Sequence, residues 1–323
     1  MKRLNVLFLM IDTVPMEFQD AVVDAISPHH NLTIFDPTRP IPEQFAGQTA
    51  VIDIGGSVGT NEMKDAAVDT KFWQIMGTGL DHVDIDYMKA KGFMVSHCPG
   101  QFSAIPLAEC ALMYMLMLSR NYHQCRKNFD NGELYWPLGY GLSGRVLGIV
   151  GFGASGQELA RRAKAFNMRI HTIDVRDIEP EIVDEIQPEF MGGPDDMDKV
   201  IAESDFLSVH LHLNDETRHI IDARRIALMK STAFIINVAR GGLVDEAALY
   251  EALLEERIAG AGLDAFAAEP PDPTLPVYQL SNVVVTPHTS GTTDDTVRMR
   301  TAACLENVNR VAEGLEPLYR VDQ

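Results

Sequence analysis

The chain has few cysteines, no long apolar run and no paired metal-binding motif. Its four cysteines, Cys98, Cys110, Cys125 and Cys304, form no Cys-x-x-Cys pair, which excludes a disulfide framework and a zinc site of the usual spacing. The longest apolar run is the nine residues from Cys110 to Leu118, whereas a membrane-spanning helix needs about 20. We therefore expect free thiols, a cytoplasmic location and no membrane segment.

Basic residues are also scarce. The 27 Lys and Arg against 46 Asp and Glu give a formal net charge of −19. An acidic surface repels phosphate backbones and anionic lipids, so neither nucleic acid nor a membrane is an expected partner. An anionic substrate would need a local basic residue. With 46% hydrophobic residues and a length of 323, the chain can form about two globular domains.

Short apolar segments alternate with helical patterns, which predicts an α/β fold with parallel sheets. Eleven strands are too many for one small sheet, and the chain changes near residue 100, where Pro99-Gly100 precedes an apolar helix over about Ala104–Arg120. We therefore expect two Rossmann-like, doubly wound parallel-sheet domains. The expected strands are Asn5–Ile11, Leu32–Phe35, Ala50–Ile54, Phe72–Met76, Met94–Ser96, Val146–Val150, Arg169–Ile173, Phe206–Val209, Ala233–Asn237, Ala261–Leu263 and Val283–Thr286.

Three further segments need interpretation. The apolar start after Met1-Lys2-Arg3 is interrupted by Asp12 and has no small-residue cleavage site, so a buried strand is expected rather than a signal peptide. Phe129–Gly144, rich in glycine and aromatics, is expected to be a loop. The acidic stretch Asp177–Asp198 is expected to be a solvated face with turns.

The strand Val146–Val150 runs directly into Gly151–Gly156, which has the pattern Gly-x-Gly-x-x-Gly and opens a helical segment. In this setting Gly151 allows a tight turn, Gly153 lets the backbone approach a pyrophosphate, and Gly156 lets helix and strand pack closely. Phosphates would lie over the free amides at the helix N-terminus. The pattern predicts a dinucleotide site.

The second strand of this unit ends at Asp174, 18 positions after the last glycine. Its carboxylate can accept hydrogen bonds from both adenosine ribose hydroxyls and would repel a 2′-phosphate, which favours NAD over NADP. Arg176 complicates this preference, since its guanidinium could stack on adenine or meet a phosphate.

Polar residues follow three later strands, at the edge where ligands bind in open parallel sheets. Arg240, Glu269 and His288 lie at or just beyond these strand ends. Reduction of a 2-oxo acid needs three groups. A cation must bind the substrate carboxylate through two hydrogen bonds, and a histidine can donate a proton near neutral pH. A protein carboxylate beside that histidine would favour its protonated form. Arg240 matches the first of these needs, His288 the second and Glu269 the third.

These segments together resemble the D-isomer-specific 2-hydroxyacid dehydrogenase family over most of the chain. The matching pieces are Gly77–Asp84, Gly151–Gly156, Asn237–Gly241, Asp264–Pro270 and Thr286–Gly291. The resemblance implies a coenzyme domain over residues 101–291 that binds NAD, and a split substrate domain of residues 1–100 plus 292–323. It also implies hydride transfer between NAD(H) and a small 2-oxo or D-2-hydroxy acid, in a homodimer joined through the coenzyme domains.

Carried over by residue, the resemblance implies that Arg240 binds the substrate carboxylate and carbonyl, and that His288 is the acid/base with Glu269 as its partner. Asp264 would hold the nicotinamide carboxamide. The expected cofactor contacts are Gly151, Gly153, Ala154, Ser155, Gly156, Asp174, Asn237, Val238, Asp264 and Gly291, and the expected substrate contacts are Gly56, Ser57, Thr78, Gly79 and Arg240. Gly56 and Ser57 fit a substrate-binding turn and an ordinary turn at the end of a strand equally well.

The chain departs from the family pattern in three places. One is Cys98, which stands before Pro99-Gly100 where asparagine is frequent. Ala154-Ser155 replaces a common Arg-Ile, and His212 stands where proline is usual. His210 and His212 would share one side of a strand, but no third ligand is evident, so no metal site is expected. Tyr135–Leu142 resembles a segment of glyoxylate and hydroxypyruvate reductases that approaches the partner's active site, although dimer packing explains Trp136 equally well.

Two alternatives remain open at this point. One is a phosphoglycerate or phosphonate dehydrogenase, which the absence of basic residues in Ile54–Asn61 disfavours for the phosphorylated substrate. The other is a non-catalytic NADH-sensing module of the corepressor type. Formate oxidation is disfavoured because relatives with that activity have glutamine where this chain has Glu269.

Overall fold

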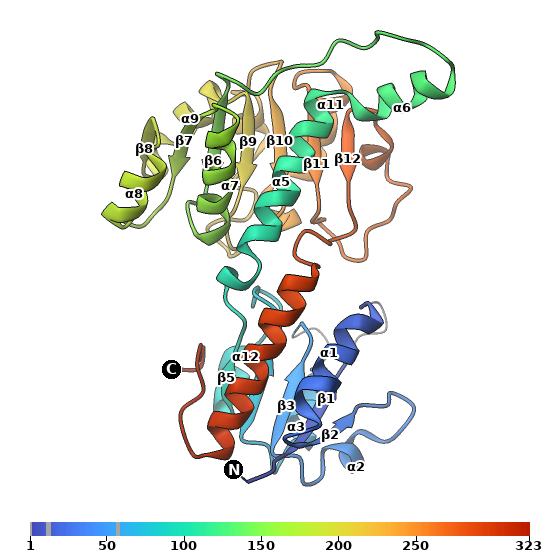
Figure 1. Ribbon diagram of the computed structural model, residues 1–323, viewed down its shortest axis with the longest axis vertical. Coiled ribbons are helices and arrows are strands. Elements are labelled where there is room, and N and C mark those ends of the chain that lie inside the picture. Colours follow the sequence, from blue (N-terminus) through green and yellow to red (C-terminus); the bar gives the residue numbers. More distant parts are fainter. Residues whose placement is uncertain (1, 11–13, 56–58) are drawn as a thin grey trace. The chain divides into compact units, whose positions relative to one another are not determined.

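The computed structural model describes residues 2–10, 14–55 and 59–323. The chain forms two compact units: unit 1 consists of Met1–Phe102 with Asp294–Gln323, and unit 2 of Ser103–Thr293. Each unit is built on its own parallel sheet (Figure 1). The predicted α/β class with two parallel-sheet units is confirmed.

Unit 1 contains a five-stranded sheet in the order β2-β1-β3-β4-β5, and all its pairings are parallel. Helices α1 and α12 cover one face around Phe8 and Cys304, and the shorter helices cover the other around Trp73. The strands are β1 (Asn5–Leu9), β2 (Asn31–Ile34), β3 (Ala50–Asp53), β4 (Phe72–Ile75) and β5 (Met94–Ser96); the helices are α1 (Met16–Ile26), α2 (Ile41–Phe45), α3 (Asn61–Ala66), α4 (Ile85–Ala90) and α12 (Asp294–Ala312).

Unit 2 contains a seven-stranded parallel sheet in the order β12-β11-β10-β9-β6-β7-β8. The order reverses between β6 and β9, which is where doubly wound sheets bind ligands. Its strands are β6 (Val146–Val150), β7 (Arg169–Ile173), β8 (Phe190–Gly192), β9 (Phe206–Val209), β10 (Phe234–Asn237), β11 (Gly260–Leu263) and β12 (Val283–Val285).

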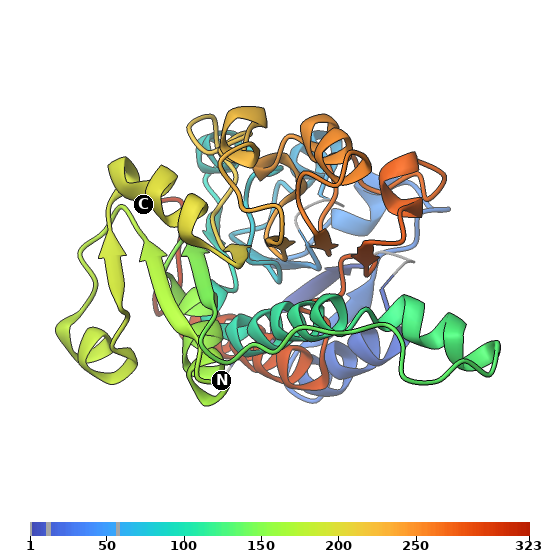
Figure 2. The ribbon, with the colours of Figure 1, turned by 90° about the horizontal axis from the view of Figure 1, so that it is seen from above.

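Helices cover both faces of this sheet (Figure 2). Helices α5, α7 and α8 pack on one face around Ile149, and α9, α10 and α11 pack on the other around Ile235. The helices of unit 2 are α5 (Ala104–Ser119), α6 (Tyr122–Asp130), α7 (Ala154–Ala165), α8 (Pro180–Ile186), α9 (Met197–Glu203), α10 (Ala223–Ile226) and α11 (Glu246–Leu254), with 3-10 turns η1 (Gly100–Phe102), η2 (Pro194–Asp196), η3 (Gly241–Leu243) and η4 (Pro276–Gln279) across the chain.

The interpretation of Asp177–Asp198 as a solvated face is consistent with its exposed and partly exposed side chains, but the expectation of turns alone was wrong. This stretch contains helix α8 and the edge strand β8, a twelfth strand that the sequence pattern did not indicate. The three residues of β8 pair only with β7 and are not fully buried, so they lack the apolar run that marks the inner strands. In addition, Phe129 and Asp130 belong to α6 rather than to the predicted loop.

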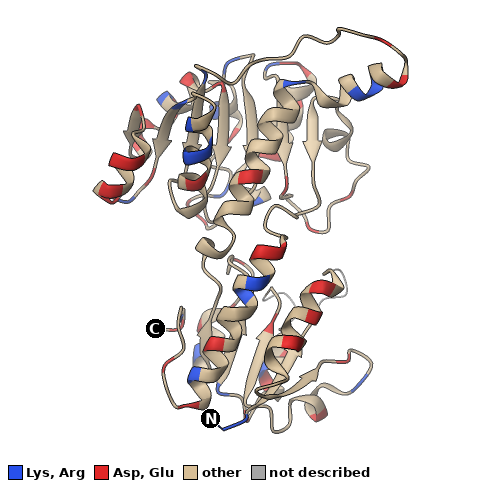
Figure 3. Ribbon diagram, in the orientation of Figure 1, with Lys and Arg blue, Asp and Glu red and all other residues tan. Residues whose placement is uncertain are grey.

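Acidic side chains are distributed over both units (Figure 3). In the part of the chain that the structure describes, no helix is long and apolar enough to cross a membrane. Among the same residues, no group of three or more His, Cys, Asp or Glu side chains is arranged to hold a metal ion. All four cysteines are free.

Candidate active site

The turn between β6 and α7 requires glycine at two positions and leaves space at a third. Gly151 has a φ of +97°, and a Cβ there would lie 2.5 Å from the carbonyl oxygen of His210. A Cβ at Gly156 would lie 2.3 Å from the carbonyl oxygen of Gly151. At Gly153 the nearest atom would be 3.8 Å away. The turn is therefore tight where strand meets helix and open where a pyrophosphate would approach.

Helix α7 begins at Ala154 with no side-chain cap, so its first amides are available to an anion. The hydroxyl of Ser155, in the first turn, lies 2.9 Å from His210 Nδ1, and His210 Nε2 lies 2.9 Å from Ser208 Oγ. Burial lowers the pKa of His210 to about 4, so its ring is neutral near pH 7. Strand β9 ends at Val209, as predicted, so His210 and His212 both lie beyond it.

Asp174 follows β7 directly, and its side chain is only 8% exposed. Oδ2 accepts a hydrogen bond from the Phe152 amide at 2.8 Å, and Oδ1 accepts one from the Arg176 amide at 2.9 Å. Burial opposes ionisation, but the guanidinium of Arg176 and the two amides outweigh it and hold the pKa of Asp174 below its ordinary value. The carboxylate is thus ionised and close to the glycine turn.

Arg240 follows β10 at the carboxyl edge of the same sheet. Its backbone is held by Asn237, whose Nδ2 donates to the Arg240 carbonyl oxygen at 2.9 Å and whose Oδ1 accepts from the Ala239 amide at 3.1 Å. Asn237 and Val238 are both buried. Arg240 Nη1 donates to the Ala239 carbonyl oxygen at 2.9 Å. The turn therefore positions the guanidinium at a strand end.

His288 and Glu269 form a hydrogen-bonded pair, with 2.8 Å between His288 Nδ1 and Glu269 Oε2. The other carboxylate oxygen, Oε1, accepts from the Phe266 amide at 3.2 Å. Burial opposes ionisation of Glu269, but the hydrogen bond and charge of His288, the Phe266 amide and the charge of Arg240 lower its pKa below the ordinary value. Both side chains remain about two-fifths exposed, so Nε2 of His288 can face a substrate.

Asp264 supports the turn that positions His288. Its side chain is fully buried. Oδ1 accepts from the Thr289 amide at 2.8 Å and from the Thr286 hydroxyl, and Oδ2 accepts from the Ser290 amide at 2.8 Å. His288 itself has a φ of +54°, a backbone conformation that a firm set of turn contacts can hold. Gly291, the residue that follows this turn, approaches α5 so closely that a Cβ would lie 3.3 Å from Leu107.

The predicted substrate contacts of unit 1 fall in two places. Thr78 and Gly79 follow β4, and the Thr78 hydroxyl accepts a hydrogen bond from Arg300 Nη2 at 3.2 Å. Sequence reasoning did not single out Arg300, which lies on α12, 222 positions away. Gly56 and Ser57 lie outside the described residues.

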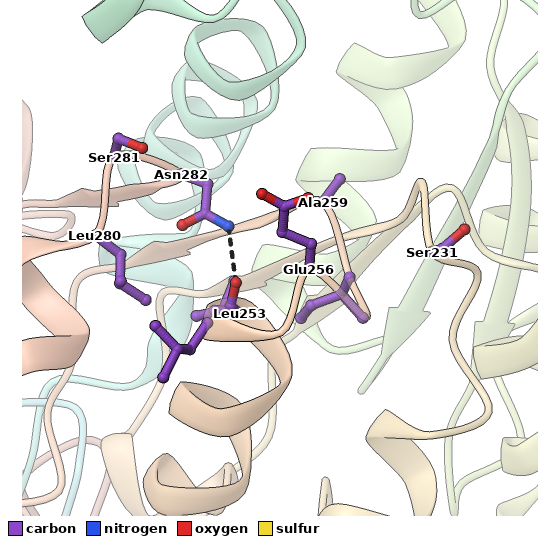
Figure 4. Close-up of a pocket in the computed structure, with 9 residues that line it drawn as sticks. Ser231, Leu253, Glu256, Ala259, Leu280, Ser281 and Asn282 are labelled. Carbon is purple, nitrogen blue, oxygen red and sulfur yellow. Dashed lines mark hydrogen bonds between the residues drawn. The ribbon is translucent and has the colours of Figure 1, made fainter.

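A pocket of about 350 Å³ in unit 2 is separate from all of these side chains. It lies at the opposite, amino-terminal edge of the sheet, before β10, β11 and β12, and includes the hydrogen bond from Asn282 to the Leu253 carbonyl oxygen (Figure 4). It is lined by Ser231, Leu253, Leu254, Glu256, Ile258, Ala259, Leu280, Ser281 and Asn282. It contains none of the predicted catalytic or cofactor residues.

Comparison with known proteins shows which family this arrangement represents. Residues 112–290 match the model of the D-isomer specific 2-hydroxyacid dehydrogenase NAD binding domain. The chain belongs to this family. It is 32% identical to a glyoxylate reductase of Korarchaeum cryptofilum over 324 residues, covering 96% of this chain and 95% of that protein.

Two other comparisons agree with this membership. A D-3-phosphoglycerate dehydrogenase of Methanocaldococcus jannaschii is 36% identical over 276 residues, which cover 84% of this chain but 51% of that longer protein. A solved D-lactate dehydrogenase from Aquifex aeolicus, complexed with NAD and lactic acid, superposes with a TM-score of 0.85 at 27% identity and 99% coverage of both chains. The protein is thus an NAD-dependent 2-hydroxyacid dehydrogenase.

Proposed function

We propose that the enzyme reduces a small, unphosphorylated 2-oxo acid to the D-2-hydroxy acid with NADH. One observation supports this most directly: a histidine hydrogen-bonded to an ionised carboxylate lies at the carboxyl edge of the unit 2 sheet, where Arg240 also lies. A proton donor and a guanidinium are the two groups that a 2-oxo acid needs during reduction.

The proposed roles follow from the charge that develops in the reaction. The guanidinium of Arg240 holds the substrate carboxylate and polarises the carbonyl oxygen. His288 gives the proton to that oxygen as it gains negative charge, and the Glu269 carboxylate stabilises the imidazolium and fixes the ring. Bound NADH supplies the hydride. In the reverse direction His288 accepts the hydroxyl proton.

We further propose that residues 101–291 bind the dinucleotide and that residues 1–100 with 292–323 bind substrate. The pyrophosphate would lie over Gly153, Ala154 and Ser155, and the adenosine ribose beside Asp174. Asp264, whose three donors lie in the Thr286–Ser290 turn, would act on the nicotinamide end chiefly by positioning that turn. In unit 1 the amides at Thr78 and Gly79, and those of Gly56 and Ser57, would hold the substrate carboxylate.

The charge of the substrate is inferred from the sequence of the loop after β3. Ile54–Asn61 contains no Lys or Arg, so this loop offers a phosphate no cation. A small 2-oxo acid such as glyoxylate or hydroxypyruvate is therefore favoured over a phosphorylated one.

The quaternary structure and location are also proposals. Exposed apolar side chains gather on one segment of unit 2 that runs from the end of α6 toward β6, namely Phe129, Leu134, Tyr135, Trp136 and Leu138. Contiguous exposed apolar residues mark interaction surfaces, which supports a homodimer joined through this unit. Four free cysteines support a cytoplasmic location.

The test is NADH and NADPH oxidation with glyoxylate, hydroxypyruvate, pyruvate, 2-oxobutyrate, 2-oxoisocaproate, phenylpyruvate and 3-phosphohydroxypyruvate. We expect turnover with a small unphosphorylated member, and none in an Arg240→Ala variant that still binds NADH. Fastest turnover of 3-phosphohydroxypyruvate would reject the proposed substrate class. Confirmed NADH binding without turnover of any member would favour the sensing module instead.

A further inference from the structure

Arg176 forms hydrogen bonds to the carboxylate of Asp174, the group that we propose binds the adenosine ribose. Its Nε donates to Asp174 Oδ1 at 3.0 Å and its Nη2 donates to Asp174 Oδ2 at 3.1 Å. The amides of Phe152 and Arg176 donate to the same two oxygens. A carboxylate has about four acceptor positions, so all of them are taken while this pair is formed.

Ribose hydroxyls can bond to Asp174 only after the guanidinium leaves. The two amide contacts belong to the backbone of the turn and can stay. The guanidinium can move, because the Arg176 side chain is 55% exposed whereas that of Asp174 is 8% exposed. Its one further hydrogen bond among the described residues runs from Nη2 to the Phe152 carbonyl oxygen at 3.3 Å. Ion pairs with such an exposed partner are weak.

The displaced guanidinium would remain beside the nucleotide. Arg176 Nη2 lies 3.8 Å from the position of a Cβ at Gly153, so the side chain reaches the space over the glycine turn. The 2′ position of the ribose would lie next to Asp174. A guanidinium released there matches the bidentate geometry of a phosphate group.

We propose that Arg176 is a specificity-determining residue with two opposite effects on the two cofactors. In the cofactor-free protein it competes with the ribose of NADH for Asp174, and in the bound state it contacts the 2′-phosphate of NADPH. The enzyme therefore uses both dinucleotides, and its preference for NADH over NADPH is smaller than Asp174 alone would produce. This inference rests on the proposed placement of the ribose at Asp174.

The test measures the Kd of NADH and of NADPH by fluorescence titration of the full-length protein. In Arg176→Ala we expect the Kd of NADH to fall by about twofold to fivefold, since a weak competitor is removed. The Kd of NADPH should rise by about tenfold or more. Arg224→Ala is the matched control, because Arg224 is a similarly exposed arginine of unit 2 paired with Asp198 and its loss removes the same charge.

A double-mutant cycle adds a second criterion. Asp174→Ala should weaken NADH binding and strengthen NADPH binding, because the guanidinium is then released and the repelling carboxylate is gone. The double variant Asp174→Ala/Arg176→Ala should not show this stronger NADPH binding. Thermal unfolding of each variant checks that the fold is kept.

Several results would overturn the proposal. If Arg176→Ala weakened the binding of NADH and NADPH equally, Arg176 would act only through its general charge. If the affinity for NADH were unchanged, Arg176 would not compete with the ribose for Asp174. Undetectable NADPH binding by the wild-type protein would remove the phosphate contact. If the wild-type protein bound neither dinucleotide, the ribose placement itself would be wrong, whereas normal binding with an unaltered NADH/NADPH ratio would reject only the role of Arg176.

Discussion

Two acidic residues position His288, one through its ring and the other through the backbone of its turn. Glu269 places an ionised carboxylate beside the ring, with its Oε2 at 2.8 Å from Nδ1 of His288. Asp264 accepts hydrogen bonds from the amides of Thr289 and Ser290, the two residues after His288. The partly exposed carboxylate of Glu269 thus supplies charge and holds the ring, whereas the buried carboxylate of Asp264 holds the backbone of the turn.

Replacing His288 by Ala should lower kcat for the best 2-oxo acid by about 10²–10⁴-fold, the usual contribution of a positioned acid/base. NADH binding should change little, because the side chain is proposed to face the substrate. Steady-state kinetics and NADH titration check both points. His29→Ala, at an exposed histidine of unit 1, is the control and should keep the wild-type rate. A variant at His288 that lost NADH binding but kept kcat would contradict its role.

At the scale of elements, the strand–turn–helix β6–α7 separates two uses of glycine. Gly156 is needed for packing, because a Cβ there would lie 2.3 Å from a backbone oxygen, whereas the space at Gly153 has no neighbour within 3.8 Å. Gly153 also has a φ of −78°, which alanine can adopt. The motif therefore contains two glycines that the fold requires, Gly151 and Gly156, and one, Gly153, that the fold itself does not require.

The difference between Gly156 and Gly153 predicts different outcomes when each is replaced by alanine. Gly156→Ala should destabilise the protein by about 1–3 kcal/mol through overpacking. Gly153→Ala should leave the melting temperature unchanged but raise the Kd of NADH by about tenfold or more, since the new methyl group would occupy the pyrophosphate space. Denaturant unfolding and fluorescence titration measure the two effects. A stable Gly153→Ala protein with wild-type affinity would place the pyrophosphate elsewhere.

At the scale of the whole molecule, the exposed apolar segment between α6 and β6 is the feature that a monomer does not explain. Trp136 is 65% exposed and Leu138 is 85% exposed. Aromatic and aliphatic side chains of this kind are enriched at subunit interfaces. Because the segment belongs to unit 2, the proposed homodimer would be joined through the dinucleotide-binding unit.

Sedimentation equilibrium should give the wild-type protein a mass near twice 35.8 kDa. Leu138→Asp should shift the equilibrium toward the monomer, because a charge would be buried in an apolar contact. Val68→Asp, at an 81% exposed residue of unit 1, should leave the dimer intact. A monomeric wild-type protein would reject the dimer, and a dimer unaffected by Leu138→Asp would place the interface elsewhere.

Most of the fold was predictable because its signals are local. Buried parallel strands appear as continuous apolar runs, and the eleven predicted strands correspond to observed ones with ends shifted by at most two residues. The edge strand β8 escaped because Phe190–Gly192 is short and partly exposed. Arg240, Glu269 and His288 could be singled out because parallel strands place their carboxyl ends at one edge.

The sequence by itself determined the two-sheet class, the dinucleotide turn and the chemical types at the strand ends, since each depends on contiguous residues. Only the tertiary structure decided which side chains meet. The Glu269–His288 pair, the Ser155–His210 contact across 55 positions and the three donors on Asp264 depend on how separate strands pack. The Asp174–Arg176 pair is close in sequence, but its formation depends on the conformation after β7 and on the Phe152 amide. A spacing indicates which groups are available, whereas packing and competing hydrogen bonds determine which partner each group takes.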